Sequence, residues 1–376
     1  MQLDASFWRG RRVFVTGHAG FKGSWLVIWL AELGAEVTGF GHAPRWSPAL
    51  LELAGLAGRL RATEGDVRDR EALADALRRA EPELVFHLAA RPIVFHALAD
   101  PVDTLETNLL GTLNLLEAIR RTPSVRAVVV VTSDKCYREP FHACRETDPL
   151  GGDEPYAASK ACAEIVTHAW RSAFLSAREG IGVATARAGN VIGGGDWSAH
   201  RLIPDLVRAF VAGTPPVLRR PGAIRPWQHV LDALSGYLLL AQALARDPQQ
   251  YASAWNFGPD PGGEWTVAEI AAAVSRRLGV GRWQVAQGPI PPEPALQRLC
   301  NERARRRLGW KPRLSTAEAV EWTVEGYREL LETGKADWLF DQIRRYRLRM
   351  AETSVRPPRA PAPAEPEVHH GLSASG

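Results

Sequence analysis

The sequence predicts an α/β protein in which parallel strands form one doubly wound sheet and a smaller lobe follows toward the C-terminus. Short apolar strands alternate with helical patterns through the first half of the 376 residues. The strands are runs of apolar, largely β-branched residues, which is typical of strands that helices cover on both faces. Beyond residue 190 the alternation loosens into segments rich in glycine, proline and tryptophan, and these indicate the separate lobe.

The periodicity assigns the elements in order along the chain. We expect strands where apolar runs are bounded by turn residues, at residues 12–16, 36–40, 84–88, 127–132 and 182–187. We expect helices where apolar residues recur every three to four positions, at residues 24–30, 102–120, 155–174, 230–245, 266–278 and 317–332.

A glycine-rich turn joins the first expected strand to the first expected helix. Gly17, Gly20 and Gly23 are spaced three residues apart. Such glycines let the backbone turn tightly and approach a pyrophosphate closely, while N–H groups at the start of the helix meet its charge. This spacing differs from the Gly-x-Gly-x-x-Gly fingerprint of dinucleotide-binding folds, so the glycines indicate a strand–turn–helix more firmly than they indicate a cofactor. The turn therefore predicts a dinucleotide site of the Rossmann type, with a glycine turn that binds nothing as the alternative.

From the sequence patterns we expect three parts in the chain. Residues 1–189 should form the Rossmann-type domain that binds the dinucleotide. Residues 190–350 should form mainly a substrate-binding lobe whose chain crosses back to the sheet. Residues 356–376 are rich in proline, alanine and small polar residues, and a segment of this composition should be a disordered tail because it cannot bury a core.

Composition argues against several other classes of protein. No apolar run reaches the roughly 18 residues that a membrane span needs, and the N-terminus lacks the pattern of a secretory signal. The net charge is only +4, and apolar residues interrupt the basic clusters at 303–307 and 344–349. We expect these clusters to be solvated helix faces and not a nucleic-acid surface. The cysteines show neither metal-ligand spacing nor a disulfide framework, so we expect no metal and a reducing cytoplasm.

Candidate catalytic residues lie after the strand at 127–132 and in the helix that follows. Tyr156 and Lys160 are four residues apart, so they share one face of that helix. A nearby ammonium favours phenolate, which would lower the pKa of the tyrosine from its usual value of about 10 and make it a base. Asp134 and Lys135 follow the strand at the edge where strand ends meet a ligand crevice. They could supply an acid and a base.

Together these segments resemble the extended short-chain dehydrogenase/reductases, also called the NAD-dependent epimerase/dehydratase family, and within it the CDP-glucose 4,6-dehydratases. The resemblance covers residues 7–327 and is most specific at residues 16–25, 132–137, 148–152, 186–197 and 225–230. Lys135 is informative, because related sugar-nucleotide dehydratases usually carry glutamate there.

The resemblance implies a nucleotide-sugar 4,6-dehydratase that works through an internal redox cycle on NAD. Tyr156, assisted by Lys160 and Ser133, would take the proton of the sugar C4 hydroxyl while NAD+ takes the hydride. Lys135 would then remove the C5 proton, and Asp134 would protonate the departing C6 hydroxyl. Return of the hydride to C6 would leave a 4-keto-6-deoxy sugar.

The resemblance also implies the ligand contacts. The cofactor would lie against Gly17, Gly20, Phe21, Gly23, Asp66, Leu88, Ala89, Ala90, Tyr156 and Lys160. The nucleotide sugar would lie near Asn190, Arg201, Arg225 and His229. Arginine suits a diphosphate because its planar fork donates two parallel hydrogen bonds. A homodimer or a dimer of dimers is expected as well, through the apolar faces of the helices at 102–120 and 155–174.

Two departures from the family pattern leave alternatives open. Residues 39–45 contain no acidic residue for a ribose 2′-hydroxyl, and Arg45 could accept a 2′-phosphate, so NADP is not excluded. The loop at 91–98 differs where it would border the sugar, so the substrate is open. A nucleotide-sugar epimerase or dehydrogenase is the first alternative, because only elimination needs Asp134 and Lys135. A non-catalytic NAD-binding regulator is the second, which the altered loop favours and the intact Tyr156 and Lys160 oppose.

Overall fold

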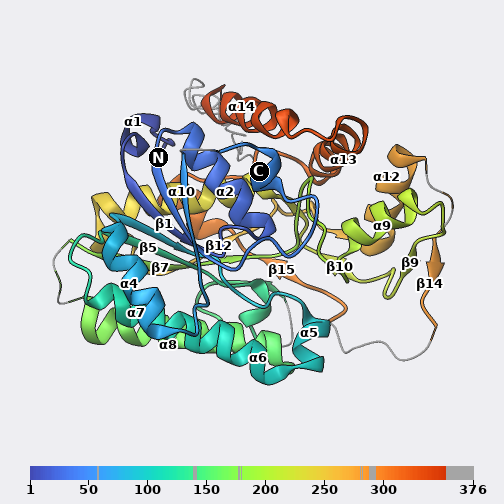
Figure 1. Ribbon diagram of the computed structural model, residues 1–376. Helices are drawn as coiled ribbons and strands as arrows, with labels where there is room; N and C mark the ends of the chain where they lie inside the picture. Colours follow the sequence, from blue (N-terminus) through green and yellow to red (C-terminus); the bar gives the residue numbers. More distant parts are fainter. Residues whose placement is uncertain are drawn as a thin grey trace, which may run out of the picture.

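A parallel sheet of seven strands forms the centre of the protein, in the order β12-β7-β5-β4-β1-β2-β3 (Figure 1). The computed structural model describes residues 1–352 apart from 57–58, 139–141, 177, 179, 280, 282 and 288–293. The five expected strands are present as β1 (Arg12–Thr16), β2 (Glu36–Gly41), β4 (Leu84–His87), β5 (Ala127–Val131) and β7 (Gly182–Ala188). The predicted fold class is thus confirmed. The expected tail at 356–376 lies outside the described residues.

The sequence patterns predict neither edge strand of the sheet. None of the five residues of β3 (Leu60–Glu64) is buried, so this strand lacks the apolar signal of a covered strand. The other edge strand, β12 (Ala254–Phe257), comes far along the chain, yet it pairs with β7 and returns the chain to the sheet.

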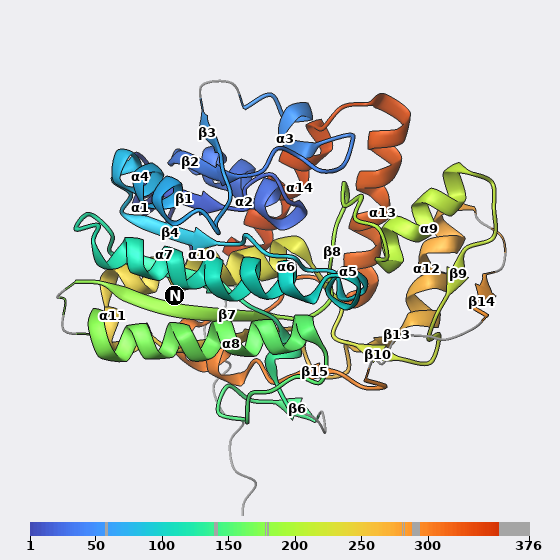
Figure 2. The ribbon, with the colours of Figure 1, turned by 60° about the horizontal axis from the view of Figure 1, so that its bottom comes forward.

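Helices cover both faces of the sheet (Figures 1 and 2). The helices α2 (Phe21–Glu32), α10 (Val230–Arg246) and α14 (Asp337–Glu352) share one apolar core with the sheet. On the opposite face α4 (Arg70–Ala80), α7 (Gly111–Arg120) and α8 (Pro155–Trp170) pack around a second core. Every residue of α2 from Gly23 to Ala31 is buried, because α10 and α14 enclose this helix against the sheet.

The expected helices appear with small changes. The segment at 102–120 is α6 (Pro101–Leu105), one π-helical turn η1 (Glu106–Leu110) and α7, while α8 continues into η3 (Arg171–Leu175). The last two expected helices are α12 (Val267–Leu278) and α13 (Thr316–Thr333). The sequence analysis did not assign α4, α14 or α9 (Leu202–Val211). The remaining short elements are α1 (Ala5–Trp8), α3 (Leu50–Leu53), α5 (Val94–Ala99), η2 (Asp134–Cys136), β6 (Ala143–Cys144), α11 (Pro248–Tyr251), β15 (Arg298–Leu299) and η4 (Ala304–Leu308).

A smaller lobe on the right of Figure 1 forms around α9, α12 and α13, which pack on a third apolar core. Three short strand pairs complete it: β8 (Val191–Ile192) with β11 (Gln228–His229), β10 (Ile224–Arg225) with β13 (Trp265–Thr266), and β9 (Val217–Leu218) with β14 (Gln284–Val285). The division of the chain at residue 190 stays a prediction, since β12 of the second segment is a strand of the sheet and α10 and α14 cover it.

The basic cluster at 344–349 lies on α14 and is partly packed. Arg345 and Arg349 stand over the ring of Trp322, at 4.3 and 5.2 Å from its centroid, and pair with Glu325 and Glu318. The cluster is therefore partly neutralised by its own protein. Among the described helices none combines the length and the apolar character that crossing a membrane requires.

Candidate active site

The turn between β1 and α2 has the backbone geometry of a phosphate cradle. Gly17 has a φ of +70°, and a Cβ built there would lie 2.6 Å from the backbone nitrogen of Ala89. A Cβ at Gly23 would lie 2.1 Å from the carbonyl oxygen of Gly17. Side chains are therefore excluded at both positions. No described side chain caps the start of α2, so its first N–H groups are available to an anion.

Two adjoining cavities lie beside this turn. The cofactor-side cavity is lined by every expected cofactor-binding residue, Gly17, Gly20, Phe21, Gly23, Asp66, Leu88, Ala89, Ala90, Tyr156 and Lys160. The substrate-side cavity is lined by the smaller lobe, including Leu218, Arg219, Arg225, Trp227 and Gln297. Because Lys135, Asn190 and Arg201 line both cavities, ligands in the two cavities would meet at these residues.

The five expected catalytic residues lie together on the wall of the cofactor-side cavity. Ser133 follows β5, donates to Asp134 Oδ1 at 3.0 Å and accepts the backbone N–H of Lys135 at 3.2 Å. Tyr156 enters from the first turn of α8, where the Glu154 carboxylate caps the helix and accepts the Tyr156 N–H at 2.7 Å. A strand end and a helix start thus form one site.

Burial dominates the titration of the tyrosine and the lysine. Burial raises the pKa of Tyr156 to about 12, while a hydrogen bond with Ser133 and the charge of Arg201 lower it. Burial also lowers the pKa of Lys160 to about 8. The sequence analysis expected Lys160 to act on the phenol. Instead the Lys160 ammonium donates to the carbonyl of Val131 at 3.3 Å, and Arg201 is the cation that lowers the pKa of Tyr156.

Asp134 has the properties of a proton donor. Burial raises the pKa of its carboxyl, whereas Lys135, Ser133 and Arg225 lower it. Ser133 bonds to one carboxyl oxygen, and within the described chain no hydrogen bond reaches the other, Oδ2. A buried carboxyl with a raised pKa and an unpaired oxygen favours the protonated form that a general acid requires.

A buried ion pair supports the helix that carries Tyr156 and Lys160. Glu164, one turn beyond Lys160, accepts hydrogen bonds from Arg187 at 2.8 Å, from Thr185 at 2.7 Å and from Thr132. The side chains of Glu164 and Arg187 are each only 3% exposed. The network ties α8 to the ends of β5 and β7. Its one signal in the sequence is that Glu164 follows Lys160 at helical spacing.

Lys22 is a second residue that the sequence analysis assigned no role. It lines the cofactor-side cavity at the start of α2. Burial and the positive charges of Arg201 and Lys160 together lower its pKa to about 7, against the opposing effect of Asp134 and Asp196. A cation held at this turn can pair with a phosphate group, which would restore its proton.

We expect the ligand-free protein to become more stable as the pH rises from about 7 to 10.5, the two pKa values of Lys22 in the folded and unfolded chain. The unfolded chain retains the proton in this range and the folded chain has released it, so raising the pH favours folding. Lys22→Met should reduce the slope, as measured by urea unfolding at several pH values. Lys160 adds a similar slope over the narrower range from about pH 8 to 10.5, and it does so in both proteins. An unchanged slope in Lys22→Met would contradict the assignment.

The expected substrate-binding residues separate into two groups. Three of them line the cavities, namely Asn190, Arg201 and Arg225. His229 does not line either cavity. Its fully buried ring lies between Trp25 and Trp322, with centroids 5.8 and 5.9 Å away, and its Nδ1 accepts the N–H of Leu231 at 3.3 Å. This placement favours packing and capping of α10 as the role of His229.

The altered loop at 91–98 borders both cavities. Arg91 and His96 both contact Asp103 of α6, at 2.6 and 2.8 Å. Phe95 lines the substrate-side cavity, where its ring stacks on His200 with centroids 4.7 Å apart. The Arg219 guanidinium lies 4.5 Å from the Phe95 centroid. The loop therefore presents an aromatic ring to the substrate side.

Asp66 and Arg45 also line the cofactor-side cavity. The Asp66 carboxylate contacts Arg68 at 2.6 Å and His42 at 3.4 Å, and hydrogen bonds from Arg68 lower its pKa to about 2. The cavity thus offers a glycine cradle for the pyrophosphate of a dinucleotide and, on the same wall, an ionised carboxylate.

Known proteins are similar to this chain in sequence and in fold. A sequence profile of the NAD dependent epimerase/dehydratase family matches residues 13–258. The chain is 42% identical over 333 residues to CDP-glucose 4,6-dehydratase of Salmonella typhimurium. The aligned region covers 87% of this chain and 93% of that protein.

Two solved structures with NAD bound have the same fold. The dTDP-glucose 4,6-dehydratase DesIV from Streptomyces venezuelae aligns with a TM-score of 0.73 and 28% identity, over 85% of this chain and 97% of that one. The UDP-glucose 4-epimerase of Thermus thermophilus aligns with a TM-score of 0.72 and 27% identity, over 84% and 99%.

Proposed function

This chain belongs to the NAD dependent epimerase/dehydratase family, and from that premise we propose that it is a nucleotide-sugar 4,6-dehydratase that acts on CDP-glucose. The observation that carries the proposal is the presence of Asp134 and Lys135 on the cavity wall that also holds Tyr156 and Lys160. Epimerases and dehydrogenases need only the tyrosine and lysine, whereas elimination needs an acid and a base in addition. The 42% identity to a CDP-glucose enzyme supports this substrate.

The cofactor is NAD, which the two aligned structures above also hold. Gly17, Gly23 and the start of α2 would bind the pyrophosphate, because they leave room and N–H groups for it. When bound, the nicotinamide supplies a hydride acceptor and donor. The fit of the glycine cradle supports this assignment independently of the relatives.

The chain's own residues then move the protons. Tyr156 accepts the proton of the C4 hydroxyl, while Ser133 hydrogen-bonds to the phenol and Arg201 contributes positive charge. The resulting ketone acidifies C5, and Lys135 takes that proton. Asp134 gives its proton to the C6 hydroxyl, which leaves as water. Oxidation at C4 balances reduction at C6, so the reaction consumes no cofactor.

The substrate-side cavity supports a nucleoside diphosphate. Arg201, Arg219 and Arg225 line it and can pair with the two phosphates. Phe95 adds an aromatic ring to the same wall. We propose that the pyrophosphate of the sugar nucleotide lies against these arginines, with the hexose toward Lys135.

A panel of CDP-, dTDP-, UDP- and GDP-glucose tests the proposed function. Purified protein with NAD should convert CDP-glucose into a 4-keto-6-deoxy product, detected by its absorbance in alkali and by mass spectrometry. We expect kcat/KM for CDP-glucose to exceed that of the other three by at least about tenfold, since a site that hydrogen-bonds a base rejects other bases. Formation of a C4 epimer without loss of water would contradict the proposal.

We also propose a homodimer, or a dimer of such dimers, through the layer of α6, α7 and α8. Val102, Leu110, Ile165 and Phe174 on these helices and their π-helical turns are 62, 44, 55 and 47% exposed. A stable interface buries more than about 1,000 Å², and apolar side chains on neighbouring helices can supply its centre.

Sedimentation velocity at micromolar concentration tests the dimer. Ile165→Asp should shift the wild-type dimer toward monomer, because it would bury a charge in the interface. Leu348→Asp on α14 is the matched control, since Leu348 is 60% exposed on another face and should leave the dimer intact. A monomeric wild type would reject the interface.

The four cysteines are unpaired in the described chain. On this ground we propose that the enzyme works in a reducing cytoplasm. We further propose that its partners are nucleotide sugars and that it has no nucleic-acid or membrane partner.

A further inference from the structure

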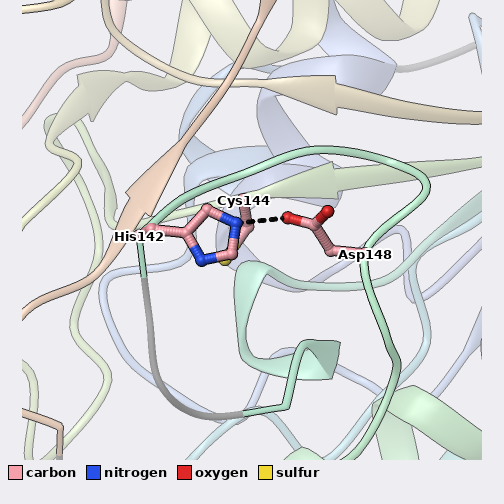
Figure 3. Close-up of side chains that lie close together, drawn as sticks. All are labelled: His142, Cys144 and Asp148. Atoms are coloured by element: carbon pink, nitrogen blue, oxygen red, sulfur yellow. Dashed lines mark ion pairs between the residues drawn. The ribbon is translucent and has the colours of Figure 1, made fainter.

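A histidine, a cysteine and an aspartate converge between the catalytic turn and α8, outside both cavities (Figure 3). His142, Cys144 of β6 and Asp148 each offer one ligand atom, and these atoms lie within 4.8 Å of one another. His142 Nε2 is 2.8 Å from Asp148 Oδ2, and the Cys144 sulfur lies behind the imidazole in this view. We propose that these three side chains bind a zinc ion.

The set of donor atoms selects the metal. Thiolate and imidazole are ligands of zinc, whereas magnesium and calcium require oxygen ligands. Ligand atoms around a tetrahedral zinc lie roughly 3–4 Å apart, given metal–ligand bonds of about 2.0–2.3 Å. Small side-chain rotations would therefore close the site. Because the His142 side chain is 66% exposed, water can complete a coordination shell with three protein ligands.

The cysteine distinguishes this cluster from an ordinary surface ion pair. His142 and Asp148 alone would form such a pair, which contributes little to stability. Cys144 is only 2% exposed, and its sulfur lies within 4.8 Å of the ligand atoms of both His142 and Asp148. Zinc would displace its proton and give the buried sulfur a charge partner.

Backbone contacts hold the ligands in place before a metal arrives. The Arg145 N–H donates to Asp148 Oδ2 at 2.9 Å and orients that carboxylate. The Cys144 carbonyl accepts from the Cys300 N–H at 2.9 Å and from the Asn256 side chain at 2.8 Å. Such supporting contacts raise metal affinity, because they remove the cost of ordering the ligands.

The position of the cluster indicates a structural role for the ion. Tyr137, two residues after Lys135, forms a bridge with Leu150, and the described residues 142–150 lead from the cluster to this bridge. The Gly151 N–H also donates to the Cys136 carbonyl at 2.9 Å. Zinc would join His142 and Cys144 on one limb to Asp148 on the other. It would thus fix the segment between Lys135 and α8 without touching the substrate.

Calorimetric titration of metal-free, NAD-saturated full-length protein with ZnCl2 tests the site. We expect one zinc per chain with release of protons, and no binding of MgCl2. Cys144→Ser and His142→Ala should each weaken zinc binding by at least about tenfold. Cys162→Ser is the matched control because Cys162 lies outside the cluster. A double alanine variant at His369 and His370 controls for the adjacent tail histidines. Both controls should bind as the wild type does.

Cobalt gives a second readout. A sulfur-to-cobalt charge-transfer band should appear in the wild type and be absent in Cys144→Ser. Zinc should raise the melting temperature of the wild type and of both controls, and not that of Cys144→Ser. If Cys144→Ser fails to fold, Asp148→Asn takes its place, because it keeps the side-chain shape. A wild type that binds no zinc, or binding that is lost only in the tail variant, would overturn the proposal.

Discussion

Tyr156→Phe should abolish conversion of CDP-glucose, lowering kcat by about 10² to 10⁴-fold. The variant loses the oxygen that accepts the C4 proton and keeps the ring, which is 8% exposed at the start of α8. Packing, NAD binding and the melting temperature should therefore change little. Steady-state kinetics with detection of the 4-keto sugar measures the loss, and fluorescence titration with NAD measures binding.

Tyr251→Phe is the matched control for the loss of a phenol oxygen. Tyr251 is also 8% exposed, but it lies on α11 and not in the cofactor-side cavity. Its variant should keep wild-type kcat. Normal product formation by Tyr156→Phe would show that another group accepts the C4 proton.

The fold could be predicted where burial leaves a pattern in the sequence. The strand β5 reads Ala-Val-Val-Val-Val and is buried throughout, so its apolar run identifies it as a covered strand. The strand β3 pairs on one edge only and buries none of its residues. Its register with β2 is set by backbone hydrogen bonds, which any sequence can make. No composition signal exists for such an edge strand.

The site could be predicted where its residues follow strand ends or helix starts. Ser133, Asp134 and Tyr156 have such positions, and the structure brings them together on one cavity wall. His229 also begins a helix, but tertiary packing turns its ring between two tryptophans. The pKa of Tyr156 likewise depends on burial and on Arg201, which is 45 residues away in sequence and has no helical spacing to it.

The candidate zinc ligands show a further limit of spacing rules. Metal motifs are recognised by repeated residues of one or two types. The cysteines of this chain form no such repeat, so the sequence analysis expected no metal. A set of one histidine, one cysteine and one aspartate becomes visible only when the loop folds back and brings Asp148 to His142.

Lys135→Ala should stop the reaction halfway, with kcat reduced by about 10² to 10⁴-fold. Tyr156, Lys160 and Ser133 are unchanged, so oxidation at C4 should still occur. The C5 proton then has no base, and the enzyme should hold its cofactor in the reduced form. Single-turnover absorbance of reduced nicotinamide measures this state. In deuterated water the wild type should also place deuterium at C5 of the product, and the variant should lose this exchange.

Lys335→Ala is the matched control, because Lys335 is an exposed lysine outside both cavities. It should show wild-type turnover and deuterium incorporation. The elimination step distinguishes a dehydratase from an epimerase, since an epimerase returns the hydride to C4 and leaves C5 untouched. Undiminished dehydration by Lys135→Ala would remove Lys135 from the mechanism. Undiminished turnover of a nucleotide sugar without dehydration, in both the variant and the wild type, would instead identify the chain as an epimerase or dehydrogenase.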